Sequence, residues 1–467
     1  MYTYDVRIWG IRKRKSKKAP YQLRWIVGGE EQQAPFMTKT LADGRRSQLM
    51  KAVRDGEQFD TETGLPVSEL RQLSSPTWYD HAQAYAYMKW PGAAAKHRVG
   101  IAEALATVTA ALVTSANGAP HVKTLRLALR GWAFQMAKNS EGEWAPRLTV
   151  EEPPAEVAAA LAWVAENSIR VSETADSENL RRALAALSRL LNGRQAADNT
   201  VLRKRSVLSN CLRYAVERGL LTTNPLTSID WAPPKTDDEV DFQFVPGPEL
   251  ASRLLDAVRA QSHRGDHLHA FFGCMYYAGM RPGEVAALAK SHCKLPEAGW
   301  GELLLRRSQP EVGSRWTDDG RSYDSRGLKR RARRSSRSVP IPPVLVAMLR
   351  QHISAHGTAP DGRLFRAVEG GRVASNEYTR VWAEARRKAL APADVGTPLA
   401  AVPYSLRHAC VSLWIKAGVD PVEVARRAGH SPAVLWKFYA KVLQGQQHAS
   451  NQLIDQALAD PGPAAAG

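Results

Sequence analysis

The sequence is poor in cysteine, and its cysteines are too far apart to form a familiar framework. The four are Cys211, Cys274, Cys293 and Cys410, and no CxxC pair occurs among them. Disulfide-stabilised secreted domains and zinc ribbons need dense or regularly paired cysteines. The sequence therefore disfavours both and is typical of a protein kept in a reducing compartment.

Long apolar runs and several common catalytic signatures are missing as well. No apolar segment is long enough to span a bilayer, and the basic N-terminus lacks the apolar core of a signal peptide. There is no Walker A loop, no GxGxxG after a strand, no HExxH and no GxSxG. His263, His267 and His269 suggest a metal site, but no cysteine pair accompanies them. We expect no membrane insertion, no cofactor and no metal.

Acidic residues are too few to balance the basic ones. Among 467 residues, 64 Lys and Arg face 46 Asp and Glu, which gives a net charge of +18. The hydrophobic fraction of 44% and the charged fraction of 24% are ordinary for a folded protein. A foldable chain with this excess is expected to bind a polyanion, either nucleic acid or an anionic membrane surface.

Composition and periodicity predict several domains and a mainly α fold with small β-sheets (α+β). The alternation in Tyr21–Val27 predicts a strand, Gly28-Gly29 a hairpin turn, and Leu41–Arg54 a helix, so the first unit reads as a small sheet packed on one helix. Further helices are expected over 180–191, ended by Gly193, and over 201–218. The expected division is a sheet-and-helix unit over 1–66, a linker over 67–76, a helical domain over 77–231, a linker over 232–239, a mixed domain over 240–445 and a flexible tail over 446–467.

Three clusters of basic residues interrupt this pattern. Residues 12–18 carry six charges in seven positions, residues 203–205 open a predicted helix, where positive charge opposes the helix dipole, and residues 326–337 hold seven basic residues and no acidic one. Each cluster is either a solvated charged surface or a contact for phosphate. The candidate phosphate contacts are Arg12, Lys13, Arg14, Lys15, Arg203, Lys204, Arg205, Arg330, Arg331, Arg333 and Arg334.

The segment YYAGMRPGEVAAL, residues 276–288, predicts a sharp corner between two helices. An apolar helix ends at Gly279, and Pro282-Gly283-Glu284 opens the next. Arg281 lies at this corner, beside helix-start N–H groups that suit an anion. Glu284 is positioned to orient it by a charge-assisted hydrogen bond, although a plain surface ion pair would show the same spacing.

A second group of tightly specified turns lies near the C-terminus. The segment PYSLRH, residues 403–408, leads into an apolar helix that Gly418 ends. Asp420 caps a further helix ending at Gly429-His430, and Ser431-Pro432 opens a short one that holds Tyr439. His430 and Tyr439 are thus expected on neighbouring short elements, although an aromatic residue in such a stripe is more often core.

Taken together, these residues resemble the tyrosine recombinase family, the phage-type integrases. Arg281, Lys329, Arg407, His430 and Tyr439 occur in this order, within GMRPGE, LRH and GH-x8-Y. The resemblance covers residues 240–445 most fully. Residues 77–231 resemble the family's core-binding domain, and residues 1–66 resemble an arm-type DNA-binding domain.

The resemblance implies a reaction and a role for each residue. Arg281 and Arg407 would hold the phosphodiester and stabilise its transition state. Tyr439 would attack phosphorus and form a 3′-phosphotyrosine, Lys329 would protonate the leaving 5′-oxygen, and His430 would assist proton transfer. With these residues in their roles no metal is required, and because the covalent link retains the bond energy, no ATP is required either. Glu284 and His408 are expected to support this site.

The chain departs from the family pattern at one position. The usual H-x-x-R motif reads Tyr404-x-x-Arg407 here, and a phenol cannot supply a cationic imidazolium. We expect a modest loss of cleavage activity relative to an enzyme with histidine at this position, rather than inactivity. Lys329 is chosen as the general acid because it is the only lysine in residues 326–337, and arginine is a poor acid.

The sequence thus predicts a site-specific DNA recombinase that integrates or excises a phage or other mobile element. Its expected partner is double-stranded DNA bearing attachment sites, bound by a homotetramer, with an excisionase and a host DNA-bending protein as accessory factors. The expected location is the bacterial cytoplasm, at the nucleoid. Two alternatives are a type IB topoisomerase-like enzyme that relaxes DNA and a catalytically silent DNA-binding regulator.

Overall fold

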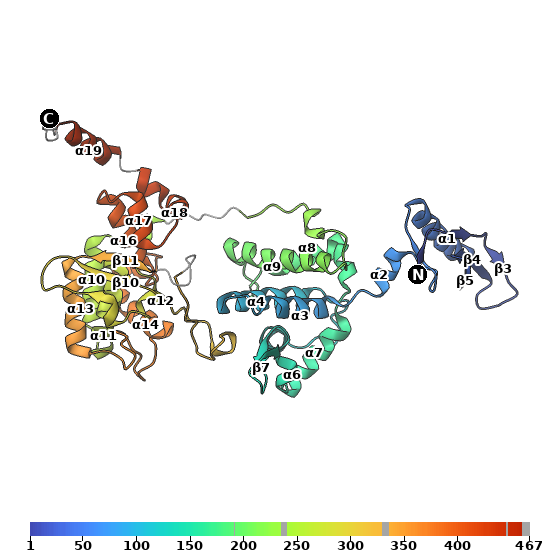
Figure 1. Ribbon diagram of the computed structural model, residues 1–467, viewed down its shortest axis with the longest axis horizontal. Coiled ribbons are helices and arrows are strands. Elements are labelled where there is room, and N and C mark those ends of the chain that lie inside the picture. The colour runs from blue at the N-terminus through green and yellow to red at the C-terminus, as the bar shows by residue number, and fades with distance from the viewer. Residues whose placement is uncertain (191, 235–240, 329–335, 445–446, 460–467) are drawn as a thin grey trace, which may run out of the picture. The chain divides into compact units, whose positions relative to one another are not determined.

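The computed structural model describes all residues except 191, 235–240, 329–335, 445–446 and 460–467 (Figure 1). The chain divides into two compact units, Met1–Lys235 and Thr236–Gly467.

The first unit begins with a four-stranded antiparallel sheet. Strand β4 (Tyr21–Val27) pairs with β2 (Val6–Ile8), β3 (Arg12–Lys13) and β5 (Glu30–Phe36), and α1 (Lys39–Arg54) contacts the sheet. Gly28 and Gly29 form the tight turn between β4 and β5 with φ of 57° and 91°, which glycine adopts without strain. The predicted strand, hairpin and helix are confirmed. Strands β1 (Tyr2–Thr3) and β6 (Phe59–Asp60) form a separate pair.

The remainder of this unit is helical, with one short hairpin. Its elements are α2 (Val67–Leu73), α3 (Trp78–Lys89), α4 (Ala95–Ala111), α5 (Val122–Ala128), β7 (Met136–Lys138), β8 (Trp144–Pro146), α6 (Arg147–Val150), α7 (Ala155–Asn167), α8 (Ser177–Leu187) and α9 (Asp198–Glu217).

Three sequence-based boundaries are corrected here. The segment 67–76, expected as a linker, contains α2. Helix α8 ends at Leu187 rather than near Gly193, because the Ser188 hydroxyl donates back to the carbonyl of Leu184 at the helix end. Helix α9 begins at Asp198, three residues before the expected start at Val201, because an acidic first turn suits the helix dipole.

The second unit surrounds a small antiparallel sheet with helices. The sheet has the order β11 (Arg337–Ile341), β10 (Gly301–Leu305), β9 (Cys293–Lys294). The helices are α10 (Pro248–Arg259), α11 (His263–Tyr277), α12 (Pro282–Val285), α13 (Pro343–His356), α14 (Ser375–Ala389), α15 (Pro392–Val395), α16 (Ser405–Lys416), α17 (Pro421–Ala428), α18 (Pro432–Gln444) and α19 (Gln447–Ala459).

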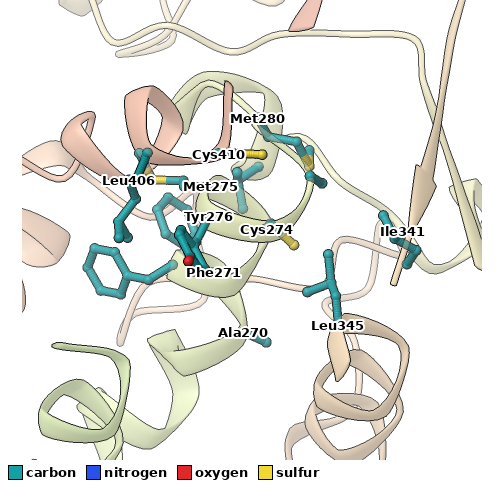
Figure 2. Packing of buried hydrophobic residues seen from close by; sticks show 14 of the residues in the cluster. Ala270, Phe271, Cys274, Met275, Tyr276, Met280, Ile341, Leu345, Leu406 and Cys410 are labelled. Carbon is teal, nitrogen blue, oxygen red and sulfur yellow. The ribbon is translucent and has the colours of Figure 1, made fainter. Parts of the chain in front are cut away.

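Helix α11 lies at the centre of this unit's core. Phe271 and Met275 of α11 are fully buried, and they belong to one apolar cluster with Leu406 of α16, Leu345 of α13 and Ile341 of β11 (Figure 2). Burying a side chain of this size contributes about 1.5–3 kcal/mol. The cluster therefore fixes the ends of α11, α16 and β11 relative to one another, and the candidate site lies at those ends.

The expected flexible tail over 446–467 is wrong in part, because residues 447–459 form α19. This stretch, QHASNQLIDQALA, contains good helix formers and neither glycine nor proline, while the glycine, proline and alanine that suggested a tail are concentrated in 460–467, outside the described residues. The fold class, mainly helical with small sheets, is confirmed. Within the described part of the chain, no helix combines the length and hydropathy needed to cross a bilayer.

Candidate active site

Arg281 lies at the corner between α11 and α12, held by Glu284. Gly279 ends the preceding segment in a left-handed conformation with φ of 58°. The Glu284 carboxylate accepts the Arg281 backbone N–H at 2.9 Å and its Nη1 at 3.0 Å. Arg281 Nη2 also donates to the carbonyl of Gly429 at 3.0 Å. Glu284 therefore occupies the helix-start N–H that the sequence had suggested for an anion, and it fixes the guanidinium instead.

Arg407 projects from the first turn of α16 into the same place. Its side chain is fully buried, and its Nη2 donates to the carbonyl of Ala428 at 2.6 Å and to His430 Nε2 at 2.8 Å. Its Nη1 donates to the carbonyl of Gly279. A guanidinium can only donate, so His430 Nε2 must accept and the imidazole proton must be on Nδ1.

His430 follows Gly429, which ends α17 in the left-handed conformation with φ of 66°. Burial and the nearby charges of Arg407, Arg281 and Arg337 lower the pKa of His430 to about 3. The imidazole is therefore neutral near pH 7. Its proton-bearing Nδ1 is buried and has no hydrogen-bond partner among the described residues.

Tyr439 lies within α18, at a break in that helix. Its φ of −125° and ψ of 19° are not helical, and its side chain is buried. The hydroxyl lies 2.8 Å from Nδ1 of His408, which follows Arg407 on α16. Burial raises the pKa of Tyr439, while burial and the charge of Arg407 lower the pKa of His408 to about 4. The pair is therefore a neutral phenol beside a neutral imidazole.

The cluster includes a third arginine, Arg337, which the sequence motifs had not singled out. Arg337 begins β11, and its Nη1 and Nη2 donate to the two carboxylate oxygens of Glu284 at 3.2 and 2.7 Å. Both side chains are 1% exposed. The sequence held a usable signal, because Arg337 alternates in phase with the buried Val339 and Ile341 and was therefore directed inward.

The cluster carries an excess of positive charge and unpaired donors. Three guanidinium groups face the single carboxylate of Glu284, whose pKa burial would raise but whose arginine neighbours lower to about 2. Among the described residues, Nε of Arg337, Nε of Arg407 and Nδ1 of His430 are buried without a hydrogen-bond partner. Leaving such donors unpaired is costly, so the arrangement is suited to an incoming anion.

Tyr404 caps the N-terminal end of α16 and packs beside these groups. Its ring centroid lies 5.0 Å from that of His408 and 5.9 Å from Cζ of Arg407. The structure thus brings together Arg281, Glu284, Tyr404, Arg407, His408, His430 and Tyr439. Lys329, Arg330, Arg331, Arg333 and Arg334 lie outside the described residues.

The other candidate phosphate contacts fall on the first unit. Arg12 and Lys13 form β3, Arg14 and Lys15 follow it, and all four are exposed. In α9, Arg203 is exposed and Arg205 stacks over the ring of Trp231 at 4.3 Å. Lys204 is buried, and burial lowers its pKa, so this side chain is not presented to a phosphate as the sequence had suggested.

The suspected histidine site lies on α11, outside this cluster. His263 and His267 contact the rings of His352 and His356 on α13, with centroids 5.0–5.3 Å apart. Across the described ranges, no three His, Cys, Asp or Glu side chains are arranged to hold a metal ion.

Sequence comparison finds curated relatives but no matching family model. The chain is 28% identical to tyrosine recombinase XerC of Neisseria meningitidis serogroup C over 267 residues, which cover 56% of this chain and 74% of that protein. It is 26% identical to an integrase of Streptomyces ambofaciens over 285 residues, 57% of this chain and 65% of that protein.

Solved structures give weaker likenesses. The Tn1549 transposon integrase in complex with a circular intermediate DNA is 13% identical, with a TM-score of 0.47, over 62% of this chain and 90% of that one. XerH recombinase bound to a difH substrate is 12% identical, with a TM-score of 0.44, over 77% and 90% of the two chains. Its curated sequence relatives are tyrosine recombinases and an integrase, and the chain is similar to that family over 56–57% of its length.

Proposed function

We propose that this protein cleaves and rejoins DNA at specific sites through a covalent 3′-phosphotyrosine on Tyr439. One observation carries the proposal. Buried, unpaired donors of Arg407, Arg337 and His430 gather around an excess of positive charge, in the same cluster as a buried tyrosine. A phosphodiester supplies the anion that such a cluster needs, and the tyrosine supplies a nucleophile.

The two arginines of the motif would act on the scissile phosphate. The Arg281 side chain is 20% exposed and so can be reached from outside, while Arg407 Nε is a buried donor with no partner of its own. Together they would neutralise the non-bridging oxygens and stabilise the pentavalent transition state.

The covalent step exchanges one phosphoester bond for another. The Tyr439 oxygen forms a bond to phosphorus, the bond to the 5′-oxygen breaks, and the phenol proton passes to water, which balances the proton that the 5′-oxygen gains. Lys329 would donate a proton to the leaving 5′-oxygen, and His430 would donate its Nδ1 proton as a hydrogen bond to the phosphate. A 5′-hydroxyl from a second strand reverses the step and joins the new strand without any other energy source.

The parts of the chain would divide the work of binding. Residues 77–231 and 240–445 would grip the core DNA site, and residues 1–66 would hold a separate arm site through Arg12, Lys13, Arg14 and Lys15. The net charge of +18 supports DNA as the partner. A homotetramer acting on two sites, with an excisionase and a DNA-bending protein, would integrate or excise a mobile element in the bacterial cytoplasm.

Strand exchange tests the proposal against the alternative that the enzyme only relaxes DNA. Two labelled duplexes from the flanks of the encoding element would be incubated with wild type and with Tyr439→Phe. We expect recombinant junctions from wild type alone. Relaxation of supercoiled DNA without junctions would instead indicate a topoisomerase, and binding without either product would indicate a regulator.

A further inference from the structure

We propose that Arg337 is a positioning residue that keeps the charge of Arg281 available to the scissile phosphate by sharing Glu284 with it. This inference rests on the proposed function. Arg337 holds one carboxylate oxygen of Glu284 at 2.7 Å and contacts the other at 3.2 Å. Arg281 Nη1 shares that second oxygen at 3.0 Å. Glu284 is thus bound by two guanidinium groups at once.

The net charge of the site depends on this shared contact between Glu284 and the two arginines. Three buried or half-buried guanidinium groups and one carboxylate leave an excess of two positive charges. Without Arg337, Glu284 would neutralise Arg281 alone, and the excess would fall to one. Charge is weakly screened where water is excluded, so this difference bears directly on a phosphate that gains charge in the transition state.

The backbone around Gly429 supports the same role. A Cβ at Gly429 would collide with the Arg337 guanidinium and come within 3.4 Å of Arg281 Nη1. Gly429 also accepts a hydrogen bond from Arg281 through its carbonyl. Strand β11, the end of α17 and the start of α12 therefore meet at the guanidinium of Arg337. These contacts hold the side chain of Arg281 in place.

A charge-restoring pair of variants tests this inference. Arg337→Met removes one positive charge, and the double variant Arg337→Met/Glu284→Gln removes one charge of each sign and returns the excess to two. The matched control is Arg264→Met, which breaks a part-buried pair with Glu377 at the opposite end of α11. Each variant would be assayed for the single-turnover rate of covalent adduct formation at saturating DNA, for DNA affinity and for thermal unfolding.

We expect Arg337→Met to slow adduct formation roughly 30- to 100-fold with little change in DNA affinity, because Arg337 acts through Glu284 and should cost less than the roughly 100- to 1,000-fold lost with a direct transition-state donor. The double variant should regain roughly tenfold of that loss, given that about 1.4 kcal/mol corresponds to a factor of ten. Arg264→Met should cleave like wild type even where its thermal midpoint falls.

Two results would overturn the inference. One is an Arg337→Met enzyme that is folded and cleaves within about threefold of wild type, well below the loss expected for this positioning residue. The other is a double variant no faster than Arg337→Met, which would mean that Arg337 acts through shape rather than charge. A methylphosphonate at the scissile position gives a second readout, because a neutral linkage should shrink the loss caused by Arg337→Met. In each case wild-type adduct formation shows separately whether the proposed cleavage occurs.

Discussion

The Nδ1 atom of His408 lies 2.8 Å from the hydroxyl oxygen of Tyr439. His408 occupies α16 one residue after Arg407, and Tyr439 occupies a break in α18, so this contact joins the proposed nucleophile to the helix that carries Arg407. The family motif has a histidine where this chain has Tyr404. In this structure, an imidazole nevertheless reaches the proposed nucleophile from α16, four residues after Tyr404.

Removing this contact should misalign the tyrosine. We expect His408→Leu to slow cleavage of a nicked substrate about tenfold, because an imprecisely held nucleophile loses part of the benefit of orientation. His408→Gln retains a hydrogen-bonding group and should lose less. A His408→Leu protein that cleaves at the wild-type rate would show that the hydroxyl needs no partner on α16.

Tyr404 should matter only modestly. Its ring packs against His408 and near Arg407, and its hydroxyl can donate a hydrogen bond but cannot carry a positive charge. We expect Tyr404→Phe to reduce the cleavage rate by roughly three- to tenfold, the size of one neutral hydrogen bond. Measured beside it, Tyr404→His should equal or exceed wild type. Loss of all cleavage in Tyr404→Phe, with Tyr404→His unchanged, would make the hydroxyl essential.

Acid should destabilise the second unit before any carboxylate near the site is protonated. Burial lowers the pKa of His352 to about 4 and of His267 to about 3, from an ordinary value of 6.5. The unfolded chain therefore takes up protons first as the pH falls, and stability that is complete above pH 6.5 declines toward pH 4. Glu284 extends the decline below 4.5, because its pKa in the folded state is about 2.

Calorimetry between pH 7 and pH 4 checks this prediction. The midpoint temperature at which the second unit unfolds should fall steadily as the pH is lowered. His352→Gln, which cannot titrate, should make the slope of this midpoint against pH shallower. A midpoint that does not change from pH 6.5 to pH 4 would contradict the neutral, buried state of these histidines.

The exposed and buried basic residues should differ in their effect on DNA binding. Arg12 and Arg14 are exposed, so Arg12→Ala/Arg14→Ala should weaken DNA binding and reduce the slope of log affinity against log salt by about two. Lys204 is buried, so Lys204→Met should leave the slope unchanged. The slopes of log affinity against log salt would be measured by fluorescence anisotropy. A reduced slope in Lys204→Met as well as in Arg12→Ala/Arg14→Ala would mean that Lys204 also reaches phosphate.

Local patterns predicted the turns of the site better than its charge network. The glycine, proline and aspartate signals correctly predicted the turns at Gly279 and Gly429 and the helix cap at Asp420. Such turns depend on the residues at the turn itself. The end of α8 was misplaced by several residues, because the prediction relied on Gly193 as the stop signal whereas the helix ends at Leu187.

The pairing of Arg337 with Glu284 depends on contacts between residues 53 positions apart, which no local pattern encodes. In the sequence, Arg337 looked like one member of a basic run. Its burial becomes visible only when Val339 and Ile341 are placed on the inner face of β11. The contact between His408 and Tyr439 likewise requires the packing of α16 against α18.

Covalent capture of DNA tests the central claim most directly. Labelled DNA from beside the encoding gene would be incubated with wild type and with Tyr439→Phe in excess EDTA, quenched with SDS, and the adduct digested for mass spectrometry. We predict a DNA-linked peptide containing Tyr439 from wild type and no adduct from Tyr439→Phe. An adduct that persists in Tyr439→Phe, or no adduct on a nicked substrate that the wild type demonstrably binds, would contradict cleavage by this tyrosine.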